Sequence, residues 1–206
     1  MRRRPAAARA LAVIATAAAW IAGAAPVAAH ENEVMRLGSF LGGLTHPVLG
    51  PDHLLAMVSV GVLSAQIGGR ALLTVPATFV GVMAIGATVG LVVSGIPMGA
   101  VELGIGGSVL LLGAIIAAGR RLPILAAMTA VGFFATFHGY AHGVETPTIA
   151  EPVQYALGFL GGTALLHLAG VLIGEVALRY RLGHPALRLS GVAVAVAGLL
   201  FVTGLA

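Results

Sequence analysis

A chain of 206 residues that is 59% hydrophobic and only 9% charged is too apolar for a soluble domain, and it is long enough for several membrane-spanning helices. It contains no Lys and no Cys, which excludes disulfides and thiolate metal ligands and leaves nitrogen and oxygen donors for any bound metal. The net charge of +4 does not indicate a nucleic-acid partner: four of the eleven arginines lie in residues 1–9, and the other seven balance the seven acidic residues.

Residues 1–29 have the pattern of a cleavable signal peptide. A basic segment at residues 2–9 is followed by an apolar segment at 10–25 and by the small-residue cleavage site Val27-Ala28-Ala29. We therefore expect one domain, residues 30–206, that begins outside the cytoplasm with His30. The free amine and the imidazole of His30 make it a weaker candidate metal ligand. The alternative to a cleaved signal peptide at residues 1–29 is an uncleaved first transmembrane helix.

Six hydrophobic runs follow, each long enough for the roughly 20 residues that a helix needs to cross the hydrocarbon core. They cover residues 37–67, 71–93, 97–118, 122–142, 153–177 and 187–205. Six arginines lie around the turns after the first, third and fifth runs, whereas the two opposite turns carry Glu145 and Glu151. The positive-inside rule makes the arginine side cytoplasmic. The sequence thus predicts an all-α, multi-pass protein of the bacterial inner membrane with six transmembrane helices. Both the N-terminus of the mature chain and the C-terminus would lie outside the cytoplasm.

Pairs of glycines four residues apart recur along these runs. The pairs are Gly86/Gly90, Gly95/Gly99, Gly158/Gly162 and Gly170/Gly174. Such spacings are typical of membrane helices that pack backbone to backbone. We expect tight helix packing there, and the pattern leaves the oligomeric state open.

The first run carries two imidazoles, a carboxylate and two prolines, all costly in lipid. On an unbroken helix His46 and His53 would lie about 10 Å apart along the axis, too far to share one small cation. Pro47 and Pro51 cannot donate to the helix ladder, so we predict a broken helix between His46 and Pro51, with Pro51 starting the second part. The break would fold His46 toward Asp52 and His53. The alternative is a kinked structural helix whose histidines donate to carbonyl groups.

A second polar stretch ends the fourth run, at its outer end. His138 and His142 are i and i+4 on a helix and face the same way, and Glu145 follows close to that face. The pair alone could be merely interfacial, but the first stretch strengthens the interpretation as a metal site. We expect a divalent cation to be captured by the second stretch and then bound deeper by the first. The predicted metal ligands are His46, Asp52, His53, His138, His142 and Glu145.

Three further residues are weaker candidates. Met57 follows His53 by four residues and is either a soft ligand or core filling. Glu102 lies a few residues into the third run, where it either lines an outer vestibule or is interfacial. His167 lies near the middle of the fifth run and is either part of an ion pathway or a satisfied core histidine.

Both polar stretches resemble motifs of the HupE/UreJ family, small membrane proteins regarded as nickel or cobalt permeases associated with hydrogenase and urease systems. The first motif is H-P-x-x-G-x-D-H at His46–His53, followed by Met57, and the second motif is F-H-G-x-A-H-G-x-E at Phe137–Glu145. The resemblance covers essentially the whole chain, without a departure in either motif. It implies Ni²⁺ or Co²⁺ as transported substrate, no prosthetic group, a link to hydrogenase or urease maturation, and the six motif residues as the functional ones.

The sequence therefore favours a secondary permease whose partners are a divalent metal ion and the lipid bilayer. Two other classes remain as alternatives: a membrane-embedded His-box metalloenzyme of the di-iron type, and a non-transporting metal sensor or assembly factor. A metalloprotease or a serine hydrolase is disfavoured, because H-E-x-x-H is absent and Gly106-Gly107-Ser108 lacks the context of a nucleophile elbow. Imidazoles suit nickel, copper and zinc alike, so the residues alone do not choose the metal.

Overall fold

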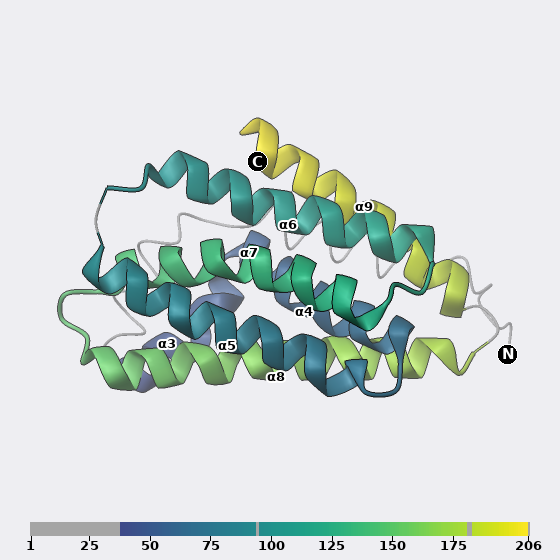
Figure 1. Cartoon of the computed structure of the whole chain (residues 1–206), viewed down its shortest axis with the longest axis horizontal. Coiled ribbons are helices and arrows are strands. Elements are labelled where there is room, and N and C mark those ends of the chain that lie inside the picture. The colour runs from purple at the N-terminus through teal and green to yellow at the C-terminus, as the bar shows by residue number, and fades with distance from the viewer. Residues whose placement is uncertain (1–37, 94, 181–182, 206) are drawn as a thin grey trace, which may run out of the picture.

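The computed structural model describes residues 38–93, 95–180 and 183–205, and within these ranges the chain forms helices joined by turns (Figure 1). The predicted signal peptide and His30 lie outside the described residues. The seven helices of the described ranges are α3 (Ser39–Leu49), α4 (Pro51–Ile67), α5 (Ala71–Val92), α6 (Met98–Ala118), α7 (Ile124–Val144), α8 (Pro152–Leu178) and α9 (Gly183–Thr203).

The helices have the length and composition of membrane spans. Helices α5 to α9 are each long and apolar enough to cross a bilayer, and α3 with α4 passes the same test as one bent pair. Only 22–44% of the residues in these five spans are buried inside the bundle, so most of their apolar side chains face outward, where lipid can cover them. The predicted all-α architecture is confirmed in the described residues, with five helices long enough to span and up to six spans if the bent pair counts as one.

The predicted break in the first span is confirmed and lies at Gly50. Helix α3 ends at Leu49, α4 begins at Pro51, and the two helices meet at 83°. Pro47 stays inside α3, whereas Pro51 occupies the first turn of α4, where its missing N–H costs nothing. Gly50 has an extended backbone, with φ −88° and ψ 115°, and this one residue changes the direction of the chain.

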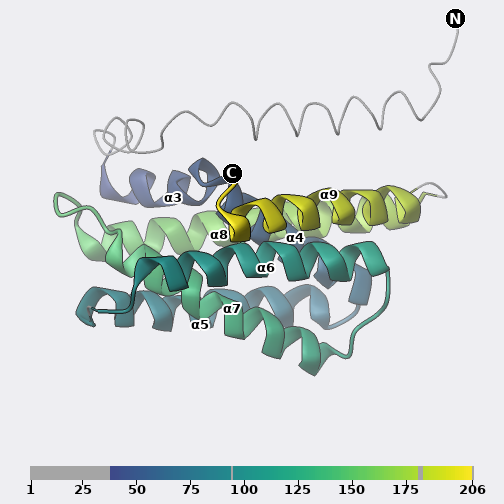
Figure 2. The same ribbon diagram turned by 90° about the horizontal axis from the view of Figure 1, so that it is seen from above.

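The spans pack as three close pairs that are not neighbours in the sequence. Helices α3 and α4 pack along α8, α5 packs along α7, and α6 packs along α9. Figure 2 shows α5 and α7 together on one side of the bundle, with α3 on the opposite side. Glycines allow the close approach: a Cβ on Gly61 of α4 would overlap the carbonyl oxygen of His167 in α8, and one on Gly139 of α7 would overlap that of Met83 in α5.

Three of the four glycine pairs predicted from the sequence lie at such contacts: Gly86/Gly90, Gly158/Gly162 and Gly170/Gly174. The prediction for Gly95/Gly99 is wrong. A Cβ on either residue would meet no atom within 4 Å. The reason is position, because Gly95 lies in the turn between α5 and α6 and Gly99 in the first turn of α6, beyond the segments where two helices touch.

The two ends of the bundle differ in charge. The turns after α4, α6 and α8 lie at one end, with the arginines Arg70, Arg120, Arg121 and Arg179, and we call it the arginine end (Figure 1). The turns after α5 and α7 lie at the opposite end, with Glu145 and Glu151, and we call it the acidic end. The backbone N–H of Glu151 donates to Ser39 Oγ at 2.8 Å, which ties the α7–α8 turn to the start of α3. That the acidic end faces outward stays a prediction from the charge pattern.

Candidate metal site

The bend between α3 and α4 turns the two imidazoles of the first motif toward each other. His46 lies in the last turn of α3 and His53 in the first turn of α4, and their ring centroids are 6.4 Å apart. A straight helix would hold the two residues about 10 Å apart along its axis. Glycine leaves room for the two polar side chains at the bend: a Cβ on Gly50 would lie 3.0 Å from Asp52 Oδ1 and 3.2 Å from His53 Nδ1, so these side chains would have to shift slightly.

Helix α7 brings the second motif against the first. The ring of His138 is 4.8 Å from that of His53, and the ring of His142 is 4.7 Å from His53 and 4.8 Å from His46, measured between centroids. The four imidazoles therefore form one group, the imidazole cluster, built by α3 and α4 on the two sides of the bend and by α7. His138 and His142 are completely buried in the described part of the chain, and His53 and His46 nearly so.

The imidazole cluster has two levels along the bundle. His142 lies one helical turn closer to the acidic end than His138, because α7 runs toward that end. His46 contacts His142 at this outer level. His53 contacts His138 at the inner level and also reaches His142. Each level thus takes one imidazole from each motif. The first motif is therefore not simply deeper than the second, as the sequence predicts; the bend sets the two motifs side by side.

Glu145 completes the outer level. Its Oε2 lies 3.8 Å from His46 Nε2, and one donor atom from each of His46, His142 and Glu145 falls within 4.8 Å of the others. Donors that share an ion at about 2.1 Å can be at most ~4.2 Å apart, so a small inward movement would close the site. Glu145 can supply this movement, since its side chain is 44% exposed.

At the inner level, Asp52 fixes the orientation of the His53 ring. Asp52 Oδ1 accepts a hydrogen bond from the backbone N–H of His53 at 2.7 Å and lies 2.9 Å from its Nδ1. A carboxylate only accepts, so the ring proton is assigned to Nδ1 and Nε2 keeps its lone pair. Nε2 is buried and has no hydrogen-bond partner among the described residues. A carboxylate behind a histidine in this way orients the ring for metal binding. Asp52 also lies in the first turn of α4, where the helix dipole favours its negative charge.

Ser108 of α6 does the same for His138. The Ser108 hydroxyl donates its only proton to the carbonyl oxygen of Ile105 at 2.6 Å, so towards His138 Nε2, 3.0 Å away, it can only accept. The ring proton of His138 is thereby assigned to Nε2, and Nδ1 keeps its lone pair. Nδ1 is buried and has no hydrogen-bond partner in the ranges that the structure describes. The sequence analysis considered Ser108 only as a hydrolase nucleophile. A lone serine in an apolar span carries no signal for this role.

His142 connects the two levels. Neither of its ring nitrogens has a hydrogen-bond partner among the described residues, although both are buried. Its ring stacks on Phe159 of α8, with centroids 4.9 Å apart and planes inclined by 27°. Burying two polar nitrogens without partners is costly. A bound cation together with a proton acceptor would remove that cost.

The weaker candidates lie outside the imidazole cluster. Met57 is fully buried in the hydrophobic core of α4, and Glu102 is exposed on α6. His167 is buried on α8, and its ring contacts that of Phe79, which also contacts His138. His30 is outside the described residues.

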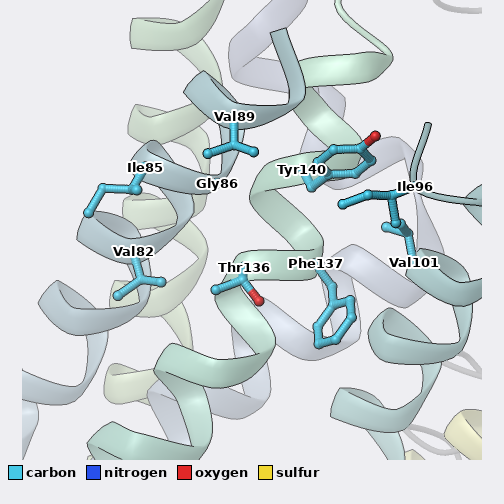
Figure 3. A pocket seen from close by; sticks show the side chains of 9 residues that line it. All are labelled: Val82, Ile85, Gly86, Val89, Ile96, Val101, Thr136, Phe137 and Tyr140. Atoms are coloured by element: carbon cyan, nitrogen blue, oxygen red, sulfur yellow. The ribbon is translucent and has the colours of Figure 1, made fainter. Parts of the chain in front are cut away.

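An apolar groove of about 220 Å³ lies on another face of α7, between α5 and α6 (Figure 3). Tyr140, which stands between the two histidines of the second motif in the sequence, borders this groove and donates its hydroxyl proton to the Val93 carbonyl at 3.2 Å. No residue that borders the groove is a histidine or an acid. The face of α7 that carries His138 and His142 is thus separate from the face that borders the apolar groove.

Comparison with known proteins decides the family. The family model described as HupE / UreJ protein matches residues 12–201. The chain is also 40% identical to Protein HupE of Rhizobium leguminosarum bv. viciae over 182 residues, which are 88% of this chain and 93% of that relative. The chain belongs to the HupE/UreJ family. No solved structure matches it significantly. The resemblance noted from the two motifs is confirmed by a match over most of the chain.

In this HupE/UreJ protein the two motifs together offer imidazole nitrogens and carboxylate oxygens inside an apolar bundle. Neutral imidazoles suit divalent nickel, cobalt, copper and zinc, and a carboxylate adds charge balance. The donor set fits a divalent transition-metal ion well and a hard cation such as Mg²⁺ poorly, because Mg²⁺ prefers oxygen ligands only. The two levels offer an ion two successive positions, one near the acidic end and one a helical turn deeper.

Proposed function

We propose that this protein is a secondary permease that takes up Ni²⁺, or Co²⁺, across the bacterial inner membrane. The observation that carries the proposal is the imidazole cluster, in which both motifs meet inside a bundle of membrane spans. Family membership supports it, because the HupE/UreJ family is linked to nickel and cobalt uptake for hydrogenase and urease.

The ion enters at the acidic end, which faces outward. Glu145, His46 and His142 capture it at the outer level, and His53 and His138 then bind it at the inner level, with Asp52 providing charge balance behind His53. An ion that exchanges most of its water for neutral imidazoles and few carboxylates is bound weakly enough to be released. Release toward the arginine end then completes uptake.

The membrane potential is a sufficient energy source for this movement. Inward transfer of one charge is favoured by about 2.3 kcal/mol per 100 mV, and a divalent ion carries two charges. The sequence has no lysine and hence no P-loop lysine for ATP. In this proposal the protein is not an enzyme. Residues 1–29 are the signal peptide and residues 30–206 the transporting domain.

The two alternative classes make different demands on the same cluster. A di-iron enzyme needs carboxylates that bridge two metals, whereas Asp52 in the described structure hydrogen-bonds to His53. A sensor or assembly factor would bind the metal without moving it. Measured flux separates it from a permease.

The test is uptake of ⁶³Ni²⁺ into cells that lack other nickel importers, with expression matched on membrane blots. We expect wild-type protein to increase uptake, and His46→Ala and His138→Ala each to remove the increase, because each takes one imidazole from a different level. His184→Gln is the matched control. His184 is exposed at the start of α9, so this variant should transport normally. Metal binding without wild-type uptake would contradict the permease and favour a sensor.

A further inference from the structure

Four buried side chains form a stripe along α8, one on each successive turn. They are Tyr155, Phe159, Thr163 and His167, each no more than 2% exposed. The stripe extends roughly 18 Å from the acidic end into the bundle. Its first two rings contact the imidazole cluster: Tyr155 lies 5.9 Å from His46, and Phe159 stacks on His142. Thr163 lies one turn deeper than Phe159 and His167 two turns deeper, because α8 runs from the acidic end to the arginine end.

His167 is a buried imidazole whose polar atoms are not used by the protein. Both of its ring nitrogens are inaccessible and have no hydrogen-bond partner among the described residues. Its ring contacts that of Phe79 of α5 edge to face, with centroids 5.2 Å apart. A core histidine held for structure would ordinarily donate to a carbonyl, since a buried unpaired nitrogen is destabilising.

Thr163 has the same property one turn closer to the imidazole cluster. Its hydroxyl is fully buried and has no hydrogen-bond partner in the described part of the chain. Other buried hydroxyls in the bundle behave differently: Ser64 and Ser108 donate to carbonyls of their own helices at 2.7 and 2.6 Å. On a helix, residues i and i+4 face the same way, so Thr163 and His167 present oxygen and nitrogen donors to the same strip of the interior.

Phe79 contacts both His167 and the inner level of the imidazole cluster. Its ring is 5.4 Å from that of His138 and 5.2 Å from that of His167, and it is completely buried. One phenyl ring therefore touches both the deeper histidine of the second motif and His167. A ring of this kind can rotate to let an ion pass, and its face attracts cations.

We propose that His167 and Thr163 form a third, inner binding position for the transported divalent cation, beside Phe79, with His167 as its deepest donor. The proposal rests on the proposed transport function and extends it, because neither residue belongs to either motif. An ion leaving His53 and His138 past Phe79 would meet the imidazole of His167 and the hydroxyl of Thr163. The inner position lowers the barrier to release by supplying these two donors.

The experiment compares Ni²⁺ flux with Ni²⁺ binding for the full-length protein. Flux is measured in proteoliposomes that contain a nickel-sensitive dye, and binding by calorimetric titration of the detergent-purified protein. We expect His167→Gln to lower flux by about tenfold or more, as removal of a metal-site partner does. Binding at the imidazole cluster should stay within about twofold of wild type, because His167 belongs to neither motif and the ring that it contacts is Phe79 and not one of the four imidazoles. His184→Gln is the control and should change neither quantity.

Wild-type flux in His167→Gln would overturn the inner position, and so would a parallel loss of flux and binding, which indicates a structural role. If wild-type protein itself moves no Ni²⁺ faster than protein-free vesicles, the permease proposal fails instead. Should His167→Gln not accumulate in the membrane, the near-isosteric Thr163→Val takes its place. It removes one unpaired hydroxyl, and unchanged flux in that variant would equally overturn the proposal.

Discussion

The two levels of the imidazole cluster are built from the same residue types but are held in different ways. At the inner level each histidine has a partner that assigns its ring proton, Asp52 for His53 and Ser108 for His138. At the outer level His142 has no hydrogen-bond partner among the described residues for either nitrogen, and the half-exposed Glu145 lies 3.8 Å from His46. The inner level is preorganised, and the outer level is adaptable.

This difference teaches how a short pathway can both accept and bind an ion. An adaptable outer level can take a hydrated ion in several orientations and exchange its water in steps. A preorganised inner level then binds with little further rearrangement, because its lone pairs already point inward. The comparison predicts that changes to the partners at the inner level are more costly than changes at the outer level.

The largest effect is expected for Asp52→Asn. An Asn amide group can donate to His53 Nδ1, which would move the ring proton to Nε2 and block the lone pair meant for the metal. We expect Ni²⁺ affinity to fall by about 100-fold, measured by titration of purified protein. Asp52→Ala removes the carboxylate without offering a donor and should cost less. If the Asp52→Asn variant binds Ni²⁺ as tightly as wild type, Asp52 does not set the tautomer of His53.

Ser108→Ala should have an intermediate effect. The substitution leaves the buried Nε2–H of His138 without its acceptor, so the ring can turn or change tautomer. We expect about tenfold weaker Ni²⁺ binding. Ser64→Ala is the matched control, because it removes an equally buried hydroxyl that bonds only to its own helix and contacts no imidazole in the described structure. Equal losses in the two variants would reduce Ser108 to a packing role.

The smallest effect is expected for Glu145→Gln, which tests the outer level. Its charge attracts the ion from solution, and attraction between exposed groups is screened by salt. We expect uptake to fall about threefold at low ionic strength and to approach wild type at high ionic strength. The measurement is initial ⁶³Ni²⁺ uptake across a salt series. A loss as large as that of Asp52→Asn at every salt concentration would erase the difference between the levels.

Much of the fold could be predicted from the sequence, since hydropathy marks the spans and Pro51 marks a helix start. Which helices pack against each other could not be predicted from the sequence. Helices in lipid associate through small residues, and thirty glycines leave too many equivalent faces. Gly95/Gly99 shows the consequence: its spacing is the same as that of Gly170/Gly174, yet no helix packs against it in the described structure.

The candidate site was predictable in its members more than in its arrangement. The i, i+4 spacing places His138 and His142 on one face, and the prolines indicate the bend that returns His46 toward His53. Which imidazole meets which depends on how α4 and α7 are aligned along each other, and no local pattern sets that alignment. Ser108 comes from a third helix and carries no local signal at all.

The central claim is that both motifs bind one ion together. X-ray absorption spectroscopy of Ni²⁺ bound to the purified protein tests it directly, because outer-shell scattering counts imidazole ligands. We expect two imidazoles per bound ion, one from each motif. The number should fall toward one in the double variant His46→Ala/His53→Ala, and also in His138→Ala/His142→Ala. Two imidazoles that survive His46→Ala/His53→Ala would mean that the second motif binds the ion alone, which would contradict the shared site.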